Sequence, residues 1–203
     1  MRINKKFDFI FLLLPLFYVC SGSIPETHYY LIDYPLELKS QQTEPVHQVT
    51  IGVERFQAMP LYDDERLVYR DSPYEGKYYN YHRWITTPEQ MITDKVIEQL
   101  NSVNLFDQVV AFPRFSNVDY VLRGTIKSFE EWDEGDVWYA RVRLEFNLVQ
   151  TANSNLVWQK TIEKKNKVVK KNPAELVKGI NTSLQQCIEE AQQNLDTLFL
   201  RLK

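Results

Sequence analysis

The sequence is poor in the residues from which redox, metal and acid–base sites are built. Among its 203 residues it has only two cysteines and three histidines, at positions 28, 47 and 82. Two cysteines are too few for a disulfide framework or a cysteine-built metal site. Six glycines and nine prolines exclude collagen-like and low-complexity material. These shortages favour a protein that is not an enzyme and that has no metal and no cofactor.

Neither sign of charge predominates in the sequence. The chain has 24 basic and 27 acidic residues, which gives a net charge of −3 and a pI near 5.7. This balance argues against a nucleic-acid partner, which usually needs a basic face. Glycine-rich phosphate loops, nucleophile elbows, Cys-x-x-Cys and His-Glu-x-x-His motifs do not occur in the sequence. The length and the 44% of apolar residues suit one domain with a buried core.

The N-terminus resembles a secretory signal. Basic Arg2, Lys5 and Lys6 precede an apolar run over residues 9–19. That run is too short to cross a bilayer, which needs roughly 20 apolar residues. Residues 1–19 are therefore predicted to be a signal peptide and are set apart from the fold.

The run ends in a segment that resembles a bacterial lipobox, Leu16-Phe17-Tyr18-Val19-Cys20-Ser21. The lipobox pattern has a small residue immediately before the cysteine and usually a leucine three residues before it. Val19 and Phe17 occupy these two positions and depart from the pattern. We expect lipidation of Cys20, with residues 20–27 as a tether and residues 28–203 as the domain. Two alternatives stay open, ordinary cleavage after Gly22 and a Cys20–Cys187 disulfide. A lipidated Cys20 followed by serine resembles the outer-membrane sorting signal of Gram-negative lipoproteins.

Residues 28–203 predict a mixed set of strands. Period-two alternation is clearest over residues 138–148, where apolar residues from Trp138 to Leu148 share one face. The acidic segment 130–136 is expected to be a loop between two strands. Strands are predicted at 28–34, 49–53, 67–70, 78–81, 107–112, 120–126, 138–148 and 156–162, with 67–70 and 78–81 paired across a turn.

Two helices are predicted from their start signals. Thr87, Pro88 and Gln90 fit a capping box, and Asn172, Pro173 and Glu175 fit a second helix start. An apolar stripe with helical spacing follows Asn172 and contains Cys187, which predicts a buried, inert thiol. His82 is interpreted as a surface or packing histidine. The order of elements indicates one α+β or α/β domain with a mixed sheet.

Two surface features stand out. Residues 160–171 hold six lysines and one glutamate. A solvated strand end is one explanation of this charge. The other is attraction to anionic lipid or to an acidic partner. Aromatic residues are dense between 69 and 84, as is typical of strands and of interfaces. The candidate partner contacts are Tyr69, Trp84, Trp132 and Trp138.

Several short segments occur in a recognisable order. They are Tyr29-Tyr30-Leu31, Val53-Glu54-Arg55-Phe56, Leu67-Val68-Tyr69-Arg70, Tyr78-Tyr79, Arg83-Trp84, Leu105-Phe106-Asp107-Gln108-Val109 and Asp119-Tyr120-Val121-Leu122-Arg123-Gly124. Over most of residues 28–200 this order resembles the ABC-transporter auxiliary lipoproteins, the group that contains PqiC-like partners of MCE lipid-transport systems.

The resemblance implies a three-layer α/β/α domain with a mixed sheet, similar to the anticodon-binding-domain and TolB N-terminal folds. It also implies a lipoprotein that faces the periplasm, assists an MCE-type tunnel protein and its ABC or integral-membrane components, and can work as a homo-oligomeric ring. The expected role is docking of the transport complex at the membrane. The alternative is a periplasmic carrier that holds an acyl chain in an apolar pocket between sheet and helix.

Overall fold

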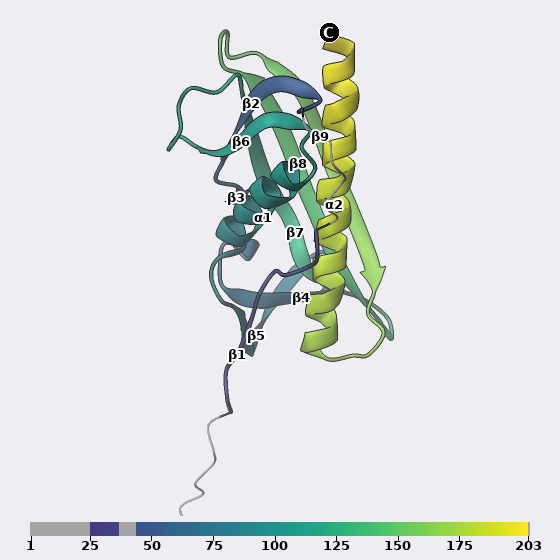
Figure 1. Cartoon of the computed structure of the whole chain (residues 1–203). Coiled ribbons are helices and arrows are strands. Elements are labelled where there is room, and N and C mark those ends of the chain that lie inside the picture. Colours follow the sequence, from purple (N-terminus) through teal and green to yellow (C-terminus); the bar gives the residue numbers. More distant parts are fainter. Residues whose placement is uncertain (1–24, 37–43, 203) are drawn as a thin grey trace, which may run out of the picture.

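The computed structural model describes residues 25–36 and 44–202, which form a nine-stranded mixed sheet and two α-helices (Figure 1). The prediction of a single α+β domain with a mixed sheet is confirmed. The elements are β1 (His28–Tyr30), β2 (His47–Glu54), β3 (Gln57–Ala58), a 3-10 helix η1 (Pro60–Tyr62), β4 (Arg66–Ser72), β5 (Glu75–Trp84), α1 (Pro88–Ser102), β6 (Phe106–Phe112), β7 (Tyr120–Glu134), β8 (Val137–Gln150), β9 (Leu156–Lys167) and α2 (Pro173–Leu202).

The long strand β7 organises the sheet. On one side it pairs along its whole length with β8, which pairs with β9, all antiparallel. On its other side three strands lie end to end, all parallel to it: β2 pairs with residues 120–122, β3 with residues 125–126 and β4 with residues 130–132. A strand of 15 residues is about 50 Å long, which leaves room for all three. The sheet therefore forks into a β2–β6 branch and a β4–β5–β1 branch.

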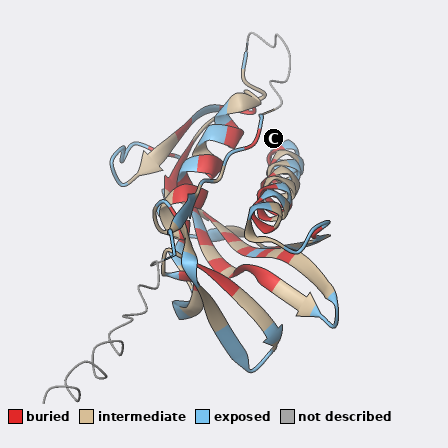
Figure 2. Ribbon diagram, turned by 90° about the horizontal axis from the view of Figure 1, so that it is seen from below, coloured by how far each residue is buried: buried red, intermediate tan, exposed pale blue. Residues whose placement is uncertain are grey.

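Both helices pack against one face of this sheet, so the described residues form two layers where three were expected (Figure 2). The segment after β1 shows that the helices are neighbours. The Asp33 amide donates to Asn181 Oδ1 of α2 at 2.8 Å, and the Tyr34 hydroxyl donates to Gln99 Oε1 of α1 at 2.7 Å. The opposite face of β8 carries Arg141 and Arg143, and charged side chains of this kind do not form the apolar floor that a second helix layer needs.

The core follows the alternation of β8. Residues 140, 142, 144, 146 and 148 are fully buried beneath α2, while Trp138 at the strand's start is half-buried. The apolar stripe of α2 is buried from Leu176 to Phe199, and Leu202 at the end of the helix is exposed. Cys187 lies in this stripe with no exposed surface, as predicted, and its Sγ lies 3.6 Å from the Val142 carbonyl oxygen. Burial raises the pKa of the Cys187 thiol to about 12.

The two predicted helix starts have different outcomes. At α2 the Glu175 amide donates to Asn172 Oδ1 at 3.0 Å, which confirms the cap. At α1 the helix begins at Pro88 as predicted, but the capping box is wrong. Thr87 makes no side-chain cap bond, because its Oγ1 accepts from the Arg55 guanidinium at 3.1 Å. Gln90 bonds the Asp94 carboxylate instead of reaching back.

Several strand boundaries differ from the predictions, and three of these differences have a clear physical reason. β1 ends at Tyr30, because the chain then leaves the sheet to bond both helices. β9 continues to Lys167, beyond the predicted end at 162, since it stays paired with β8. The largest difference is the acidic segment 130–136, expected to be a loop. Residues 130–134 belong to β7, and the turn is Gly135 and Asp136.

Candidate functional site

A hollow of about 460 Å³ lies on the helix side of the sheet, where the β4–β5 branch meets β7 and β8. Here α2 packs against β7, β8 and β9 and α1 against β2, β3 and β6, so this part of the sheet has no helix above it. We call it the aromatic hollow. Its lining residues are Tyr69, Tyr78, Tyr79, Asn80, Tyr81, His82, Glu131, Asp133 and Trp138.

Two carboxyl groups, Glu131 and Asp133, lie side by side on β7 in the aromatic hollow. Glu131 is 1% exposed, and the Tyr79 hydroxyl donates to its Oε2 at 2.7 Å. Burial raises the pKa of Glu131 to about 8, opposed by the Tyr79 bond and assisted by the charge of Asp133. Burial also raises the pKa of Asp133. A side-chain hydrogen bond between the two carboxyl groups adds to the raised pKa of Glu131 and opposes the rise in the pKa of Asp133.

Asp133 is incompletely bonded within this pair. Its Oδ1 is buried and has no hydrogen-bond partner among the described residues. A side-chain hydrogen bond to Glu131 and, to a smaller extent, the positive charges of Lys171 and Lys77 oppose the effect of burial on the pKa of Asp133. Lys77 also forms ion pairs with Asp71 at 3.2 Å and Glu75 at 3.5 Å, and it lies over the Tyr69 ring. The hollow thus combines an acidic floor with basic groups at its border.

The wall of the hollow formed by β5 is built from stacked rings. His82 stacks on His28 with ring centroids 5.2 Å apart and meets the Tyr79 ring edge-on at 5.5 Å. Its Nδ1 shares a hydrogen bond of 3.0 Å with the Tyr30 hydroxyl. Burial, with a smaller effect of His28, lowers the pKa of His82, so the ring is neutral at pH 7. This agrees with its interpretation as a packing histidine.

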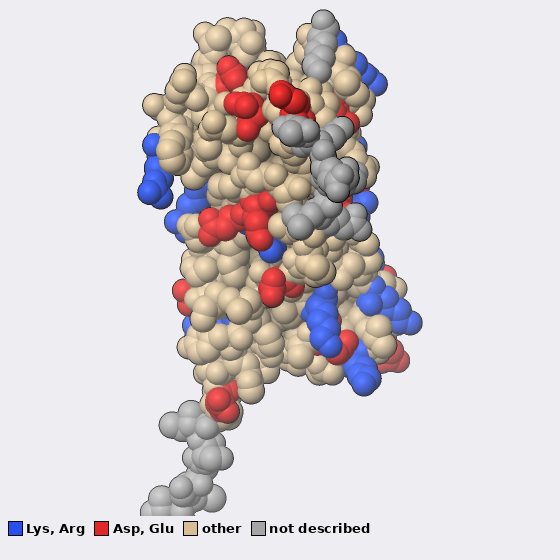
Figure 3. Space-filling model, in the orientation of Figure 1, with Lys and Arg blue, Asp and Glu red and all other residues tan. Residues whose placement is uncertain are grey.

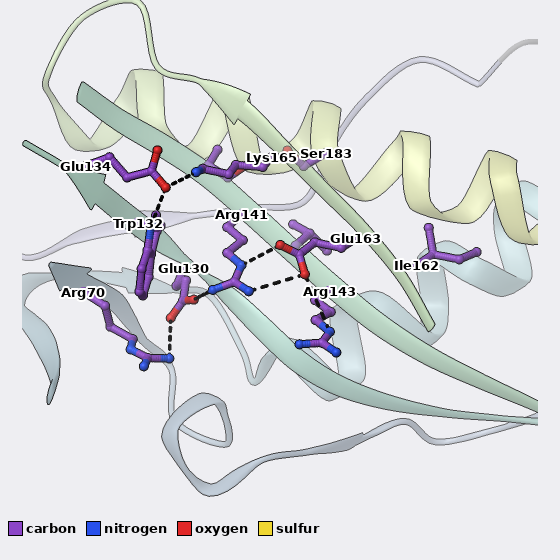
Figure 4. A network of polar contacts seen from close by, with 12 residues as sticks. Arg70, Glu130, Trp132, Glu134, Arg141, Arg143, Ile162, Glu163, Lys165 and Ser183 are labelled. Carbon is purple, nitrogen blue, oxygen red and sulfur yellow. Dashed lines mark hydrogen bonds and ion pairs between the residues drawn. The ribbon is translucent and has the colours of Figure 1, made fainter. Parts of the chain in front are cut away.

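The opposite face of β7 holds a separate polar network (Figure 4). Glu130 is fully buried there, where the Tyr62 hydroxyl donates to it at 2.5 Å. Two arginines, Arg70 and Arg141, form ion pairs with Glu130 at 3.6 and 3.4 Å. Both guanidinium groups also lie over the Trp132 ring, at 5.3 and 5.1 Å from its centroid. These interactions compensate the burial of Glu130 and hold the Trp132 ring.

The lysine-rich segment is partly neutralised by its own fold. Lys160 and Lys164 on β9 form ion pairs with Glu190 of α2 at 3.1 and 2.8 Å, and Lys165 pairs with Glu134. Figure 3 shows basic side chains gathered at the lower right, where β9 passes into α2. Only the end of the run, with Lys170 and Lys171, lies between these two elements. With Lys160, Lys164 and Lys165 paired, the cationic tract is reduced to Lys167, Lys170 and Lys171.

The four candidate partner contacts do not form one surface. Tyr69 and Trp138 both line the aromatic hollow. Trp132 lies on the opposite face, since it pairs across strands with Tyr139 whereas Trp138 pairs with Asp133. Trp84 is 1% exposed and packs on Phe129 with ring centroids 4.9 Å apart, so its assignment as a contact is corrected to a core residue. Cys20 lies outside the described residues.

The sequence analysis missed Glu131, Asp133 and Tyr79 as site residues. The segment 130–136 contains five acidic residues, which are typical of a solvent-exposed loop, so its strand was not predicted. An irregularity in the β7–β8 register between Ile126 and Ser128 shifts the alternation, which hides the strand signal. The tyrosine density of residues 69–81 was the available signal for the hollow.

Other site chemistries are not found in the described part of the chain. Residues 25–36 and 44–202 contain no group of three or more His, Cys, Asp or Glu that could hold a metal ion. Within the same residues, no helix is both long and apolar enough to cross a membrane. The only described cysteine, Cys187, is buried and free.

Comparisons with solved structures show a similar fold in other proteins. Protein XCC0632 from Xanthomonas campestris matches with a TM-score of 0.76 and 17% identity over 86% of this chain and 98% of that one. An uncharacterized protein matches with a TM-score of 0.68 and 17% identity over 84% and 99%. The hypothetical protein CT253 from Chlamydia trachomatis matches with a TM-score of 0.54 and 6% identity over 75% and 98%.

Comparison with sequence families gives a more specific result. A search of curated proteins finds no match to this sequence. The family model of the ABC-type transport auxiliary lipoprotein component matches residues 30–191, which is most of the chain and includes the aromatic hollow. The chain therefore belongs to the family of ABC-type transport auxiliary lipoprotein components.

Proposed function

We propose that this protein is a non-enzymatic docking subunit that holds an MCE-type lipid-transport complex against a membrane of the bacterial envelope. Its anchor is Cys20, its domain faces the periplasm, and the serine after Cys20 directs it to the outer membrane. Its partners are an MCE-family tunnel protein and ABC or integral-membrane transport components. Membership of a transport auxiliary lipoprotein family is the observation that carries this proposal.

The position of the first described residues supports a membrane-facing orientation. The chain enters the domain at the β1–β5 end, and α2 ends at the opposite end of the molecule (Figure 1). Cys20 precedes Pro25 by five residues, which span at most about 18 Å when extended. The end that carries β1 and β5 therefore stays close to the lipid surface. Tyr74, 96% exposed, lies in the β4–β5 turn.

The anchor is tested by intact-mass analysis of protein from membrane fractions, beside a Cys20→Ala variant. The expected result is a triacyl-sized mass increment on a chain that starts at Cys20, with the variant lost from the membrane fraction. A free N-terminus at Ser23 in soluble protein would contradict the anchor.

The docking role is tested by co-purification with MCE-type proteins. The expected result is capture of a tunnel protein and its transport components, weakened by Trp138→Ala. Phe115→Ala is the matched control, because Phe115 is also an exposed aromatic residue but lies in the β6–β7 loop. If Trp138→Ala leaves the capture unchanged, the aromatic hollow is not part of the contact with the transport components. Native mass spectrometry of the same sample tests assembly into a homo-oligomeric ring.

The space between the sheet and the helices gives little support to the alternative of an acyl-chain carrier. The hollow between α1 and α2 has a volume of about 160 Å³ and is lined largely by glutamine side chains, with Ser102 and Glu189. Ligand pockets are typically about 300–1,000 Å³ and mostly apolar. Lipid that copurifies with the protein and is released by unfolding would favour the carrier.

A further inference from the structure

The loop between β9 and α2 presents three exposed residues from a frame that is fixed at both ends. Val168 is buried in the core, and its amide donates to a carbonyl oxygen of β8 at 2.8 Å. At the other end, Asn172 caps α2 through its Oδ1. The residues between these two fixed points are all exposed, and they are Val169, Lys170 and Lys171. We call residues 169–171 the basic loop.

The basic loop is cationic and apolar at once. Lys170 and Lys171, like Lys167 before them, form no ion pair with any other residue that the structure describes. Val169 is 86% exposed beside these charges, and the aliphatic stems of the lysines enlarge its apolar surface. Such a surface suits the boundary between water and lipid, where binding grows with buried apolar area and with attraction to anionic headgroups.

The basic loop lies at the end of the domain where the chain enters. Figure 1 shows the start of α2 and the first described residues at this end, with the end of α2 opposite. Asn181 Nδ2 donates to the Leu31 carbonyl oxygen at 3.4 Å, and Asn181 lies about 12 Å along α2 from its start at Pro173. The chain from Cys20 to Leu31 can extend to about 40 Å. An anchor at Cys20 therefore leaves the basic loop within reach of the lipid surface.

We propose that the basic loop binds the surface of a bilayer that contains anionic phospholipids, with Lys170 and Lys171 at phosphate groups and Val169 between the headgroups. The choice of lipid over an acidic protein rests on the proposed function, because acylation of Cys20 keeps this end of the domain beside headgroups. A tether alone lets the domain turn over the membrane. A second contact at the basic loop holds α2 pointing away from it.

A neighbouring carboxylate opposes this attraction. Asp136, in the turn between β7 and β8, is exposed. It lies two residues before Trp138, whose carbonyl oxygen accepts the Val168 amide bond. Its negative charge therefore lies near the same lipid surface and is repelled by anionic headgroups. Removal of this charge should strengthen binding, which is the opposite of the effect of removing a lysine.

The test uses the full acylated chain in vesicles, with a fluorescent probe on Ala174→Cys. Ala174 is exposed in the first turn of α2, so the probe lies beside the basic loop and leaves it intact. Cys187 has no exposed surface and the acyl chain blocks Cys20, so the probe attaches at residue 174 alone. The vesicles contain phosphatidylglycerol, phosphatidylethanolamine and a spin-labelled lipid, which quenches a probe at the level of the headgroups.

The control probe is on Leu156→Cys, which is exposed at the opposite end of β9, about 40 Å along the strand. The expected result is strong quenching at residue 174 and weak quenching at residue 156. In vesicles of phosphatidylcholine alone, the quenching at residue 174 should fall. It should also fall at about 1 M salt, where charges are screened over about 3 Å.

Charge variants read at residue 174 locate the contact. Lys170→Gln and Lys171→Gln should each lower the ratio of bound to unbound loop about fivefold. Val169→Ser should lower it as well, and Asp136→Asn should raise it. Arg201→Gln is the matched control, because it removes a positive charge from an exposed position in the last turn of α2, and it should change nothing.

Four results would overturn the proposal. Quenching at residue 174 could be no stronger than at residue 156, it could be equal in vesicles of phosphatidylcholine alone, or it could be unchanged by Lys170→Gln and Lys171→Gln. Quenching that changes only when transport components are added would assign the basic loop to an acidic protein partner.

The outcome is separable from that of the proposed function. The vesicles hold no transport component, so binding of the basic loop by a protein that captures none would refute the docking function alone. Capture of transport components without quenching at residue 174 would refute the lipid contact alone. If the mature protein lacks acyl chains, the same probes are read after mixing with excess vesicles, and absence of quenching there also overturns the proposal.

Discussion

Replacing Glu131 with glutamine is expected to change how the stability of this protein depends on pH. Glu131 is 1% exposed, and burial raises its pKa from about 4.5 to about 8. The folded state therefore holds this proton more tightly than the unfolded state does. The stability that Glu131 contributes is fully present below about pH 4.5 and is lost as the pH rises toward about 8.

The size of the effect follows from the two pKa values. Between about pH 5 and about pH 8, ionisation of Glu131 should lower the free energy of unfolding by about 3 kcal/mol. In Glu131→Gln this loss is absent, while the glutamine oxygen can still accept from the Tyr79 hydroxyl. The melting temperature of the variant should rise relative to the original protein by roughly 6–12 °C over this range.

The assay is thermal or urea unfolding of both proteins at a series of pH values. Other titrating groups are common to the two proteins, so the difference between their curves reports Glu131 together with its coupling to Asp133. Glu134→Gln is the matched control, because Glu134 lies on the same strand but is exposed and paired with Lys165, which lowers its pKa. Its effect should be small and of opposite sign. Parallel pH profiles for the original protein and Glu131→Gln would refute the reasoning.

Four further substitutions test the packing and the cap of α2. Trp84→Ala should lower the free energy of unfolding by about 3–5 kcal/mol, because Trp84 is a core residue. The half-buried Trp138→Ala should cost clearly less, and equal losses in urea titrations would contradict the two assignments. Asn172→Ala should cost about 1 kcal/mol by removing the cap of α2, as measured by urea unfolding monitored by circular dichroism, and an unchanged midpoint would contradict this. Gly124→Ala should cost about 1–3 kcal/mol, because its Cβ would lie 2.0 Å from the Phe56 ring. Combining it with Phe56→Ala in a double-mutant cycle should show strong non-additivity, and simple additivity would argue against the clash.

Local patterns predicted the elements whose signals lie within a single stretch of chain. The alternation of residues 140–148 and the apolar stripe of α2 each specify a buried face without reference to any other element. Asn172 caps α2 through a bond to a residue three positions away, so neighbouring sequence is enough to predict it. The Thr87 capping box failed for a complementary reason, since Arg55, 32 residues away, binds the threonine hydroxyl.

The candidate site illustrates the limit of this reasoning. Tyr69 and Trp138 were selected by residue type, and the fold brings both into one hollow, 69 positions apart in sequence. Trp84 has the same residue type but lies in the core, because Trp84 and the ring of Phe129 pack together. Aromatic side chains suit cores and interfaces equally well, so type alone does not separate the two.

By itself the sequence determined two helices, a strongly alternating strand, an inert buried thiol and the resemblance to a family whose model matches the chain. Only the tertiary structure decided that both helices share one face and that Glu130 and Glu131 are buried on opposite sides of β7. A buried carboxylate needs donors, and those of Glu130 and Glu131 come from Arg70, Arg141, Tyr62 and Tyr79. Tyr79, for example, reaches Glu131 only through the pairing of strands that lie more than 50 residues apart in sequence. No local pattern specifies that pairing.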